Sequence, residues 1–326
     1  MNSIIIATDT FEQINGVSTT YKNILNVTNK KINLIHPGIF KWKSINAYPE
    51  IQICCEPIKV YKAIQKIKPT HIHIATEGPI GLVARIYCKL NKLPFTSAYH
   101  TKFPEYLNIY LKIPINFGYG LMKLFHKKSR AILVPSSSCL EDLKNKGFKN
   151  LVLWTRGVSS SLIKTVSKNT DHGKIKVLSV GRISKEKNLE ALCELNKDFD
   201  ITIIGDGPEL KRLKKKYKSI TFPGYKFGTE LANYYSQNDV FCFTSKTDTF
   251  GIVIIEALCN GLPVVGYNVT GPKDLVRSNK DGYLGNDLKE NIYKSIKLSK
   301  KNIQQYSIKK WTWKKCEEIL FKQLLD

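Results

Sequence analysis

The stretch DVFCFTSKTDTFGIVIIEALCNGLPVVGYN, residues 239–268, holds a long apolar segment between two short strand-like runs. DVFCFTS precedes that segment and PVVGYN follows it. Continuous apolar strands separated by helical segments are typical of parallel sheets that are covered on both faces. This stretch therefore predicts an α/β fold.

The same alternation extends outward through the whole chain. The other runs are SIIIATD, INLIHPG, IQICC, THIHIAT, FTSAYHT, AILVPS and NLVLWTR in the first half, and KIKVLSVGR, DITIIGDG and SITFPGY in the second. Two such series predict two Rossmann-like, doubly wound domains. We place them at residues 1–158 and 173–305, and the polar stretch 159–174 has the composition of a linker.

The chain's composition indicates a cytosolic protein. Its 326 residues suffice for two domains with their own cores. We find neither a secretory signal nor an apolar run of 18 residues. The eight cysteines are scattered without a C-x-x-C pair, which favours reduced thiols over a disulfide framework, and no metal site is expected.

The formal net charge is +24, and it is distributed unevenly. Residues 1–157 carry 22 Lys and Arg against 8 Asp and Glu, which leaves 29 against 19 for the remainder. The difference, +14 against +10, favours a basic first half that meets phosphates, nucleic acid or a membrane surface. A lysine-rich composition would also follow from a low-GC genome.

Two carboxylates lie in the opening stretch, Asp248 and Glu256. Asp248 has the residue type of a helix N-cap. Glu256 stands among apolar residues, where an ionised side chain without a partner is costly, so it requires a donor. If both lie on one helix, eight residues rise about 12 Å, and the two acids can line one side of an elongated ligand.

Other polar residues and glycines follow predicted strands, where doubly wound sheets bind ligands. Arg182 and Lys187 in VGRISKEKN come just after one strand and can clamp a diphosphate, although both also fit a solvated surface. Gly205 follows the next strand in GDGPELK. In the first half, Gly16 follows a strand in a turn where backbone can approach a ligand, and His100 ends another strand.

An ordered set of motifs resembles the retaining GT-B glycosyltransferases of family 4. The motifs are DTFEQINGVSTT, HIATEGPIGLVAR, AYHTKFPEYL, VLWTRGV, VGRISKEKN, GDGPELK and DTFGIVIIEALCNGLPVVGYNVTGP. HIATEGP and YHTKFPEY are most similar to bacterial lipid glycosyltransferases, among them α-mannosyltransferases and enzymes that glycosylate diacylglycerol. The resemblance implies a GT-B fold, two Rossmann-like domains facing a cleft, with a C-terminal helix over 306–326 that crosses back to the first domain.

The resemblance also implies roles for the residues at the strand ends. Arg182 and Lys187 would hold the diphosphate, Asp248 the hydroxyls of the donor sugar, and Glu256 the ribose. Asp248 replaces the glutamate that the family's motif usually carries. In the first domain, Gly16 would lie against the diphosphate or sugar, and His100 would contact the transferred sugar across the cleft. The nucleotide-sugar site implied by the family further includes Gly205, Phe250 and Gly251.

The expected activity is transfer of a hexosyl or hexuronosyl group from a UDP- or GDP-linked sugar to a lipid, diacylglycerol or a related glycolipid. No metal or other cofactor is expected, because Arg182, Lys187 and helix N-termini can stabilise the leaving diphosphate. The alternatives are a mannosyltransferase acting on a cell-surface polysaccharide precursor and a sugar-nucleotide epimerase. A nucleic-acid-binding protein is a non-enzyme alternative, but no recognition motif supports it.

Residues 106–130, YLNIYLKIPINFGYGLMKLFHKKSR, interleave aromatic and aliphatic residues with basic ones. This composition suits a surface that docks on anionic lipid, which would place the protein in the cytoplasm, peripherally on the inner face of the membrane. Two helices that face the core and expose solvated lysines are an equally good interpretation.

Overall fold

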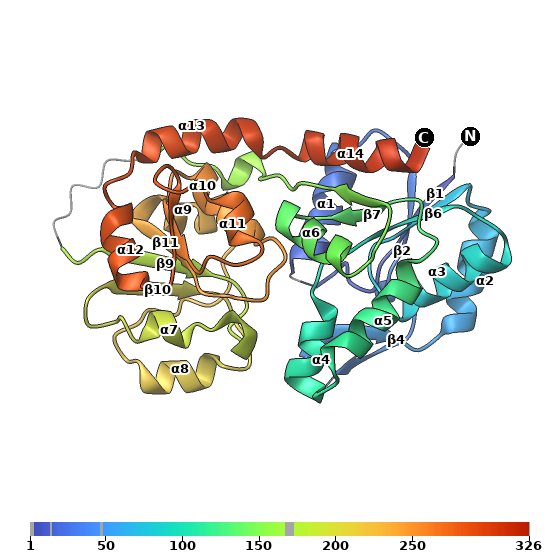
Figure 1. Cartoon of the computed structure of the whole chain (residues 1–326), viewed down its shortest axis with the longest axis horizontal. Coiled ribbons are helices and arrows are strands. Elements are labelled where there is room, and N and C mark those ends of the chain that lie inside the picture. The colour runs from blue at the N-terminus through green and yellow to red at the C-terminus, as the bar shows by residue number, and fades with distance from the viewer. Residues whose placement is uncertain (1–2, 14, 46–47, 167–172, 326) are drawn as a thin grey trace. The chain divides into compact units, whose positions relative to one another are not determined.

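The computed structural model describes residues 3–13, 15–45, 48–166 and 173–325 (Figure 1). The chain divides into two compact units. Unit 1 comprises Met1–Arg156 together with Trp313–Asp326, and unit 2 comprises Gly157–Thr312. Each unit is described by itself.

Unit 1 is built on a parallel sheet of six strands in the order β2-β1-β5-β6-β7-β8. Its strands are β1 (Ile4–Ala7), β2 (Ile32–Ile35), β5 (His71–Ile74), β6 (Phe95–Ala98), β7 (Ile132–Val134) and β8 (Leu151–Leu153). Its helices are α1 (Gly16–Val27), α2 (Pro57–Ile67), α3 (Pro79–Leu90), α4 (Phe103–Leu111), α5 (Ile115–His126), α6 (Ser137–Asn145) and α14 (Trp313–Leu325), with a short 3-10 helix η1 (Pro37–Ile39).

Alternate residues of the central strand β1 pack into cores on opposite faces of the sheet. Ile4 and Ile6 belong to a cluster with residues of α1 and α14. Ile5 and Ala7 belong to a cluster with residues of α2 and α3. Because side chains alternate along a strand, a continuous apolar run such as SIIIATD is the pattern that a sheet covered on both faces requires.

The run IQICC, expected in the parallel sheet, lies instead in a separate antiparallel pair. β4 (Tyr48–Cys54) pairs with β3 (Trp42–Ile45), a strand that the sequence interpretation missed. Parallel pairing needs a crossover of a dozen or more residues, whereas β3 ends three positions before β4 begins. Adjacency in the sequence therefore favours the hairpin.

Unit 2 is built on a parallel sheet of five strands in the order β10-β9-β11-β12-β13. Its strands are β9 (Lys176–Val180), β10 (Asp200–Ile204), β11 (Val240–Phe243), β12 (Val264–Gly266) and β13 (Gly282–Leu284). Its helices are α7 (Glu190–Cys193), α8 (Leu210–Lys216), α9 (Gly228–Gln237), α10 (Ile252–Cys259), α11 (Pro272–Leu275), α12 (Leu288–Ser295) and α13 (Lys300–Lys310), with 3-10 helices η2 (Ser160–Leu162) and η3 (Lys185–Lys187). Here too the strand residues alternate between two cores, with Leu178 in one and Val177 in the other.

One expectation for unit 2 was wrong, and one further stretch is described only in part. The run SITFPGY, 219–225, lies beside β10 but does not form a full strand: Thr221 makes an isolated parallel bridge with Thr202, and Gly224 accepts from Gly205. Pro223 within the run has no N–H for a ladder. Part of the polar stretch 159–174 is packed, because the side chain of Asn260 bonds to the backbone of Leu162 and Lys164 at 2.8 and 2.9 Å. Residues 167–172 of that stretch lie outside the described residues.

The segment 306–326, expected as one helix, is divided between α13 and α14. Trp311 leaves the helical conformation, with φ −104° and ψ 82°. Its ring is buried in a core of unit 2, 5.9 Å from the ring of Phe250, whereas Trp313 is buried in a core of unit 1. The helix breaks because two tryptophans that are two positions apart are anchored in different cores.

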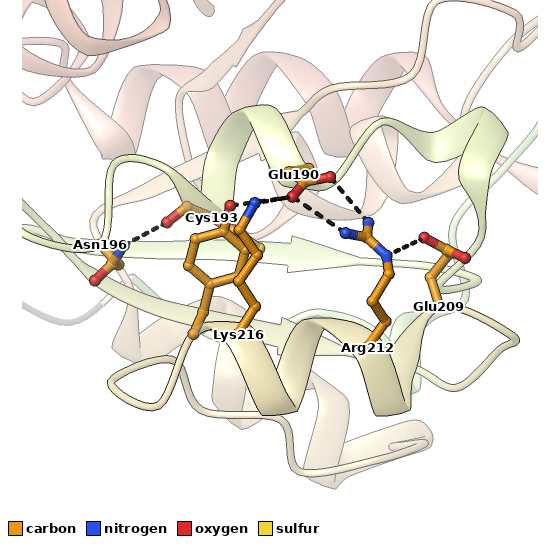
Figure 2. A network of polar contacts seen from close by, with 7 residues as sticks. Glu190, Cys193, Asn196, Glu209, Arg212 and Lys216 are labelled. Carbon is orange, nitrogen blue, oxygen red and sulfur yellow. Dashed lines mark hydrogen bonds and ion pairs between the residues drawn. The ribbon is translucent and has the colours of Figure 1, made fainter.

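A surface network of charges joins α7 to α8 in unit 2 (Figure 2). Glu190 accepts hydrogen bonds from Arg212 at 2.9 and 3.2 Å and from Lys216 at 2.5 Å, and Arg212 also donates to Glu209 at 2.7 Å. Exposed ion pairs of this kind contribute little stability each. Some of the chain's many basic residues therefore serve an ordinary solvated surface.

Candidate functional site

The sequence-predicted residues of unit 2 gather at the carboxyl edge of its sheet. Arg182 and Lys187 follow β9, and Gly205 follows β10. Asp248, Phe250 and Gly251 lie in the loop between β11 and α10, and Glu256 lies within α10. This is the edge at which open α/β sheets bind ligands.

Lys187 and Asp248 form an ion pair with each other. The Lys187 ammonium donates to both carboxylate oxygens of Asp248, at 2.7 and 2.8 Å. The two side chains are 23% and 18% exposed. Thr244 Oγ1 donates to the carbonyl of Lys187 at 2.7 Å, which fixes η3 against the loop that carries Asp248. The pair holds a cation and an anion, both within reach of solvent, at one point on the sheet edge.

Asp248 is not a helix cap, and it does not share a helix with Glu256. The cap position of α10 belongs to Gly251, whose φ of 92° lies in the left-handed region. A Cβ there would also meet Ile254 at 2.9 Å and Phe243 at 3.2 Å. Only glycine suits this position. The helix begins at Ile252, four positions after Asp248, so the expected helical spacing of the two acids was wrong.

Glu256 is buried, and its donor is a tyrosine that the sequence interpretation missed. Tyr235, fully buried on α9, donates its hydroxyl proton to Glu256 Oε2 at 2.9 Å. Burial raises the pKa of Glu256 to about 6, and the hydrogen bond from Tyr235 acts in the opposite direction. A carboxyl so placed changes its charge near neutral pH.

This shift makes the stability of unit 2 pH-dependent. Because the folded pKa is raised above 4.5, the folded state binds more protons between pH 4.5 and 6, and the free energy of unfolding falls by about 2 kcal/mol as pH rises through that window. Glu256→Gln should remove this loss. Calorimetry at each pH gives the melting temperature of the variant minus that of the unsubstituted chain. This difference should be larger at pH 7.5 than at pH 4.5. An equal difference at both pH values would contradict the assignment.

Arg182 lies in a loop that packs closely on the loop after β10. Gly205 has φ 136°, and a Cβ on it would come within 1.9 Å of the carbonyl oxygen of Gly181. Gly205 is therefore required for packing between the two loops. Burial raises the pKa of Tyr225, the charge of Asp206 raises it further, and the charge of Arg182 lowers it.

Tyr225 and Phe227 add an aromatic surface that the sequence interpretation missed. Their rings are stacked with centroids 6.0 Å apart, and the two residues are 44% and 56% exposed. Gly205 donates its backbone N–H to the carbonyl of Gly224 at 3.0 Å. This bond places the neighbouring aromatic residues, Tyr225 and Phe227, at the same sheet edge. Exposed aromatic rings beside a cation suit a flat, anionic ligand. Phe250, in contrast, packs its ring into the core against Trp311, so it can meet a ligand only through its backbone.

In unit 1, Gly16 is the first residue of α1 and is exposed. Asn15 caps this helix, and its side-chain oxygen accepts from the N–H groups of Val17 and Ser18 at 3.0 and 2.9 Å. Two donors at the helix N-terminus are thus already engaged. The backbone at Gly16 remains accessible to a ligand.

His100 follows β6, and both of its ring nitrogens have partners within unit 1. Nε2 lies 3.1 Å from the hydroxyl of Tyr21, and Nδ1 lies 2.9 Å from Nη2 of Arg156. Burial is the main cause that holds the pKa of His100 well below its ordinary value, and the charge of Arg156 adds to it. Tyr21 and Arg156 were not predicted. They lie 79 and 56 positions from His100 in the sequence, so no local sequence pattern connects them with it.

Two family profiles match consecutive parts of the chain. The family described as Glycosyltransferase Family 4 matches residues 46–162, and the family described as Glycosyl transferases group 1 matches residues 163–306. Together they cover the greater part of both units.

Curated relatives carry glycosyltransferase names. Sulfoquinovosyl transferase SQD2 of Arabidopsis thaliana is 30% identical over 70% of this chain and 48% of its own length. A GDP-mannose-dependent alpha-mannosyltransferase of Corynebacterium glutamicum is 29% identical over 69% of this chain and 57% of its own. Alpha-monoglucosyldiacylglycerol synthase of Streptococcus pneumoniae is 26% identical over 80% and 70%. The chain thus spans about half the length of the first two relatives.

Solved structures share the fold. HepE of Anabaena, crystallised with UDP and glucose, superposes with a TM-score of 0.75 at 15% identity, over 99% of both chains. At this identity the likeness concerns the fold alone.

Proposed function

Since the chain belongs to the family 4 glycosyltransferases of GT-B architecture, we propose that it transfers a hexosyl or hexuronosyl group from a UDP- or GDP-linked sugar to diacylglycerol or a related glycolipid. The observation that carries the donor assignment is the Lys187–Asp248 ion pair at the sheet edge, in the same strand-end region as Arg182. The lipid acceptor is supported by the name of one relative, alpha-monoglucosyldiacylglycerol synthase.

In this proposal the Lys187–Asp248 pair opens when the donor binds. Phosphate oxygens compete with the Asp248 carboxylate for the Lys187 ammonium, and Asp248 then accepts hydrogen bonds from sugar hydroxyls. Arg182 supplies a planar set of donors to the same diphosphate. As the glycosidic bond breaks, negative charge grows on the departing nucleoside diphosphate, and these two cations stabilise it.

The remaining assignments are weaker contacts with the same donor. Gly205, Phe250 and Gly251 would contribute backbone groups at the sheet edge of unit 2, and Gly16 would do so in unit 1. His100 would touch the transferred sugar through its ring edge or backbone, because both ring nitrogens already have partners. No metal ion is required, and transfer should therefore continue in the presence of EDTA.

Substitutions of the two acids, Glu256 and Asp248, should affect donor binding in different ways. Glu256→Gln should weaken binding of the free nucleoside diphosphate, because the amide loses the charge that accepts from ribose hydroxyls. Asp248→Asn should leave binding of the diphosphate unchanged and impair use of the intact sugar donor. Titration calorimetry with UDP and with GDP measures the first effect, and steady-state kinetics the second. Equal losses of nucleotide affinity in both variants would refute these roles.

The acceptor surface proposed for unit 1 lies on α4 and α5. Phe117, Leu121 and Leu124 are 60%, 44% and 66% exposed and recur at helical spacing on one side of α5. Buried residues Gly118, Tyr119, Met122 and His126 occupy the other side. We name the exposed residues Leu111, Phe117, Leu121, Leu124, Lys112, Lys123, Lys127, Lys128 and Arg130 the α4–α5 surface.

An apolar stripe with basic neighbours suits the headgroup region of an anionic membrane. No helix within the described residues combines the length and the apolar character that crossing a bilayer requires. We therefore propose peripheral association of the α4–α5 surface with the cytoplasmic face of the membrane. Nucleic acid is not a proposed partner.

A mannosyltransferase that acts on a cell-surface polysaccharide precursor is the second candidate, favoured by the GDP-mannose-dependent relative. A screen of UDP- and GDP-sugars with purified protein and vesicles containing diacylglycerol distinguishes the two, with mass spectrometry of the lipids as readout. A hexosylated lipid product is expected. Transfer only to water-soluble or polyprenyl-type acceptors would favour the second candidate, and conversion of the sugar nucleotide without acceptor would indicate an epimerase.

A further inference from the structure

A chain of hydrogen bonds runs through the interior of unit 1 and ends at His100. Thr96 Oγ1 lies 2.8 Å from His73 Nδ1, and His73 Nε2 lies 2.7 Å from the hydroxyl of Tyr21. The Tyr21 hydroxyl lies 3.1 Å from His100 Nε2, and His100 Nδ1 lies 2.9 Å from Nη2 of Arg156. Thr96, His73, Tyr21 and Arg156 are all buried, so each of these groups needs its partner.

The chemistry of arginine gives the chain a direction. A guanidinium group can only donate, so His100 Nδ1 must accept from Arg156. The proton of a neutral His100 ring then lies on Nε2, which donates to the Tyr21 oxygen. Tyr21 in turn donates its single proton to His73 Nε2, which leaves the proton of His73 on Nδ1, facing Thr96. If the hydrogen-bond chain ran in the opposite direction, His100 Nδ1–H would point at an N–H of Arg156, and two donors would face each other.

We infer that Arg156 sets the direction of the hydrogen-bond chain Arg156→His100→Tyr21→His73→Thr96 and thereby fixes His100 as the tautomer protonated on Nε2. Arg156, Tyr21 and His73 are positioning residues for His100. The only nitrogen lone pair of His100, on Nδ1, is consequently engaged by Arg156 and cannot take a proton from an acceptor. The statement that His100 cannot take a proton from an acceptor bears on sugar transfer, so it rests on the proposed function.

The surroundings of Arg156 fit this role. Its Nη1 donates to the carbonyls of Trp154 and Thr155 at 2.8 and 2.9 Å, and its guanidinium lies 4.2 Å from the centre of the Trp154 ring. Trp154 is itself fully buried and donates to the carbonyl of Cys316 at 2.8 Å. The guanidinium is therefore held in place independently of His100. Burial lowers the pKa of His73 to about 3 and keeps that ring neutral, with smaller effects from His71 and Arg156.

The tautomers can be read directly from ring ¹⁵N shifts in two-bond ¹H–¹⁵N spectra of the full chain labelled at histidine. Variants His100→Gln and His73→Gln assign the signals. The expected result is two neutral rings of opposite tautomer, with the proton on Nε2 in His100 and on Nδ1 in His73. A His100 ring protonated on Nδ1 or on both nitrogens, or the same tautomer in both rings, would overturn the inference.

A break in the middle of the chain tests which end sets the direction. In Tyr21→Phe, His100 should keep its Nε2–H tautomer because Arg156 still donates to Nδ1, whereas the His73 signals should change. If His100 changes and His73 does not, the direction is set from the Thr96 end and the inference fails. Tyr21→Phe removes one oxygen atom from the core, so folding should survive.

Kinetics add a second readout for Arg156. Arg156→Met should lower kcat on the order of 10-fold with little change in KM for the nucleotide sugar, and Arg156→Lys, which keeps a donor, should recover part of the loss. Arg212→Met in the network of Figure 2 is the control and should retain full activity. Full kcat in Arg156→Met would overturn the positioning role. If the tautomers are as expected but the unsubstituted chain transfers no sugar, the proposed function fails and the tautomer assignment stands.

Discussion

Replacing Arg182 or Lys187 with alanine is expected to lower turnover on the order of 10²-fold or more, with little effect on folding. The estimate follows from the loss of one oxyanion-hole donor, which carries a comparable share of transition-state stabilisation. Both cations lie at the sheet edge where the diphosphate is proposed to bind, and charge on that group increases as the sugar departs. Most of the loss should therefore appear in kcat. Steady-state assays with the donor identified by the screen measure it.

The structure provides a matched control for Lys187. Lys185 lies in the same 3-10 helix but is exposed, so Lys185→Ala should keep normal turnover. Lys187→Ala also leaves the Asp248 carboxylate without its ion-pair partner, and the double variant Lys187→Ala, Asp248→Asn removes that complication. Near-normal turnover in the double variant would exclude Lys187 and Asp248 together from the donor site. Near-normal turnover in Arg182→Ala would exclude that arginine.

The sequence predicted which residues gather at the sheet edge but not how they pair. Arg182, Lys187 and Asp248 follow strands, and parallel topology brings the carboxyl ends of neighbouring strands to one edge. The bond between Lys187 and Asp248 joins residues 61 positions apart, and that between Arg156 and His100 joins residues 56 apart. Such contacts depend on strand order and loop conformation, which apolar periodicity does not specify.

The wrong predictions about β4 and about the C-terminal helix have different causes. The apolar run of β4 has the composition of a sheet strand, but the strand just before it in the sequence was not recognised, and the two pair with each other. The break between α13 and α14 has no glycine or proline to mark it. It depends on Trp311 and Trp313 being buried in different cores, which only the tertiary structure reveals.

The α4–α5 surface should control binding to anionic membranes. Replacing Lys123, Lys127, Lys128 and Arg130 with glutamine should weaken binding to vesicles containing phosphatidylserine by roughly 1 kcal/mol per charge at most, so by up to about 10³-fold for all four. Lys123 lies within α5, and Lys127, Lys128 and Arg130 are exposed in the segment that follows it. Because salt screens such attraction, added salt should weaken the unsubstituted chain in the same way. Vesicle sedimentation measures both effects.

A control with the same loss of charge separates this surface from the general basicity of the chain. Lys211, Lys214, Lys215 and Lys218 are exposed in and just beyond α8 of unit 2, and their replacement by glutamine should leave vesicle binding much closer to normal. Transfer to a water-soluble acceptor should be unchanged in both quadruple variants, because neither touches the residues proposed to hold the donor. Equal loss of vesicle binding in both variants would mean that the attraction comes from net charge alone. If neither the quadruple substitution in the α4–α5 surface nor added salt changes vesicle binding, α4 and α5 are scaffold. The lipid acceptor is then reached through another surface.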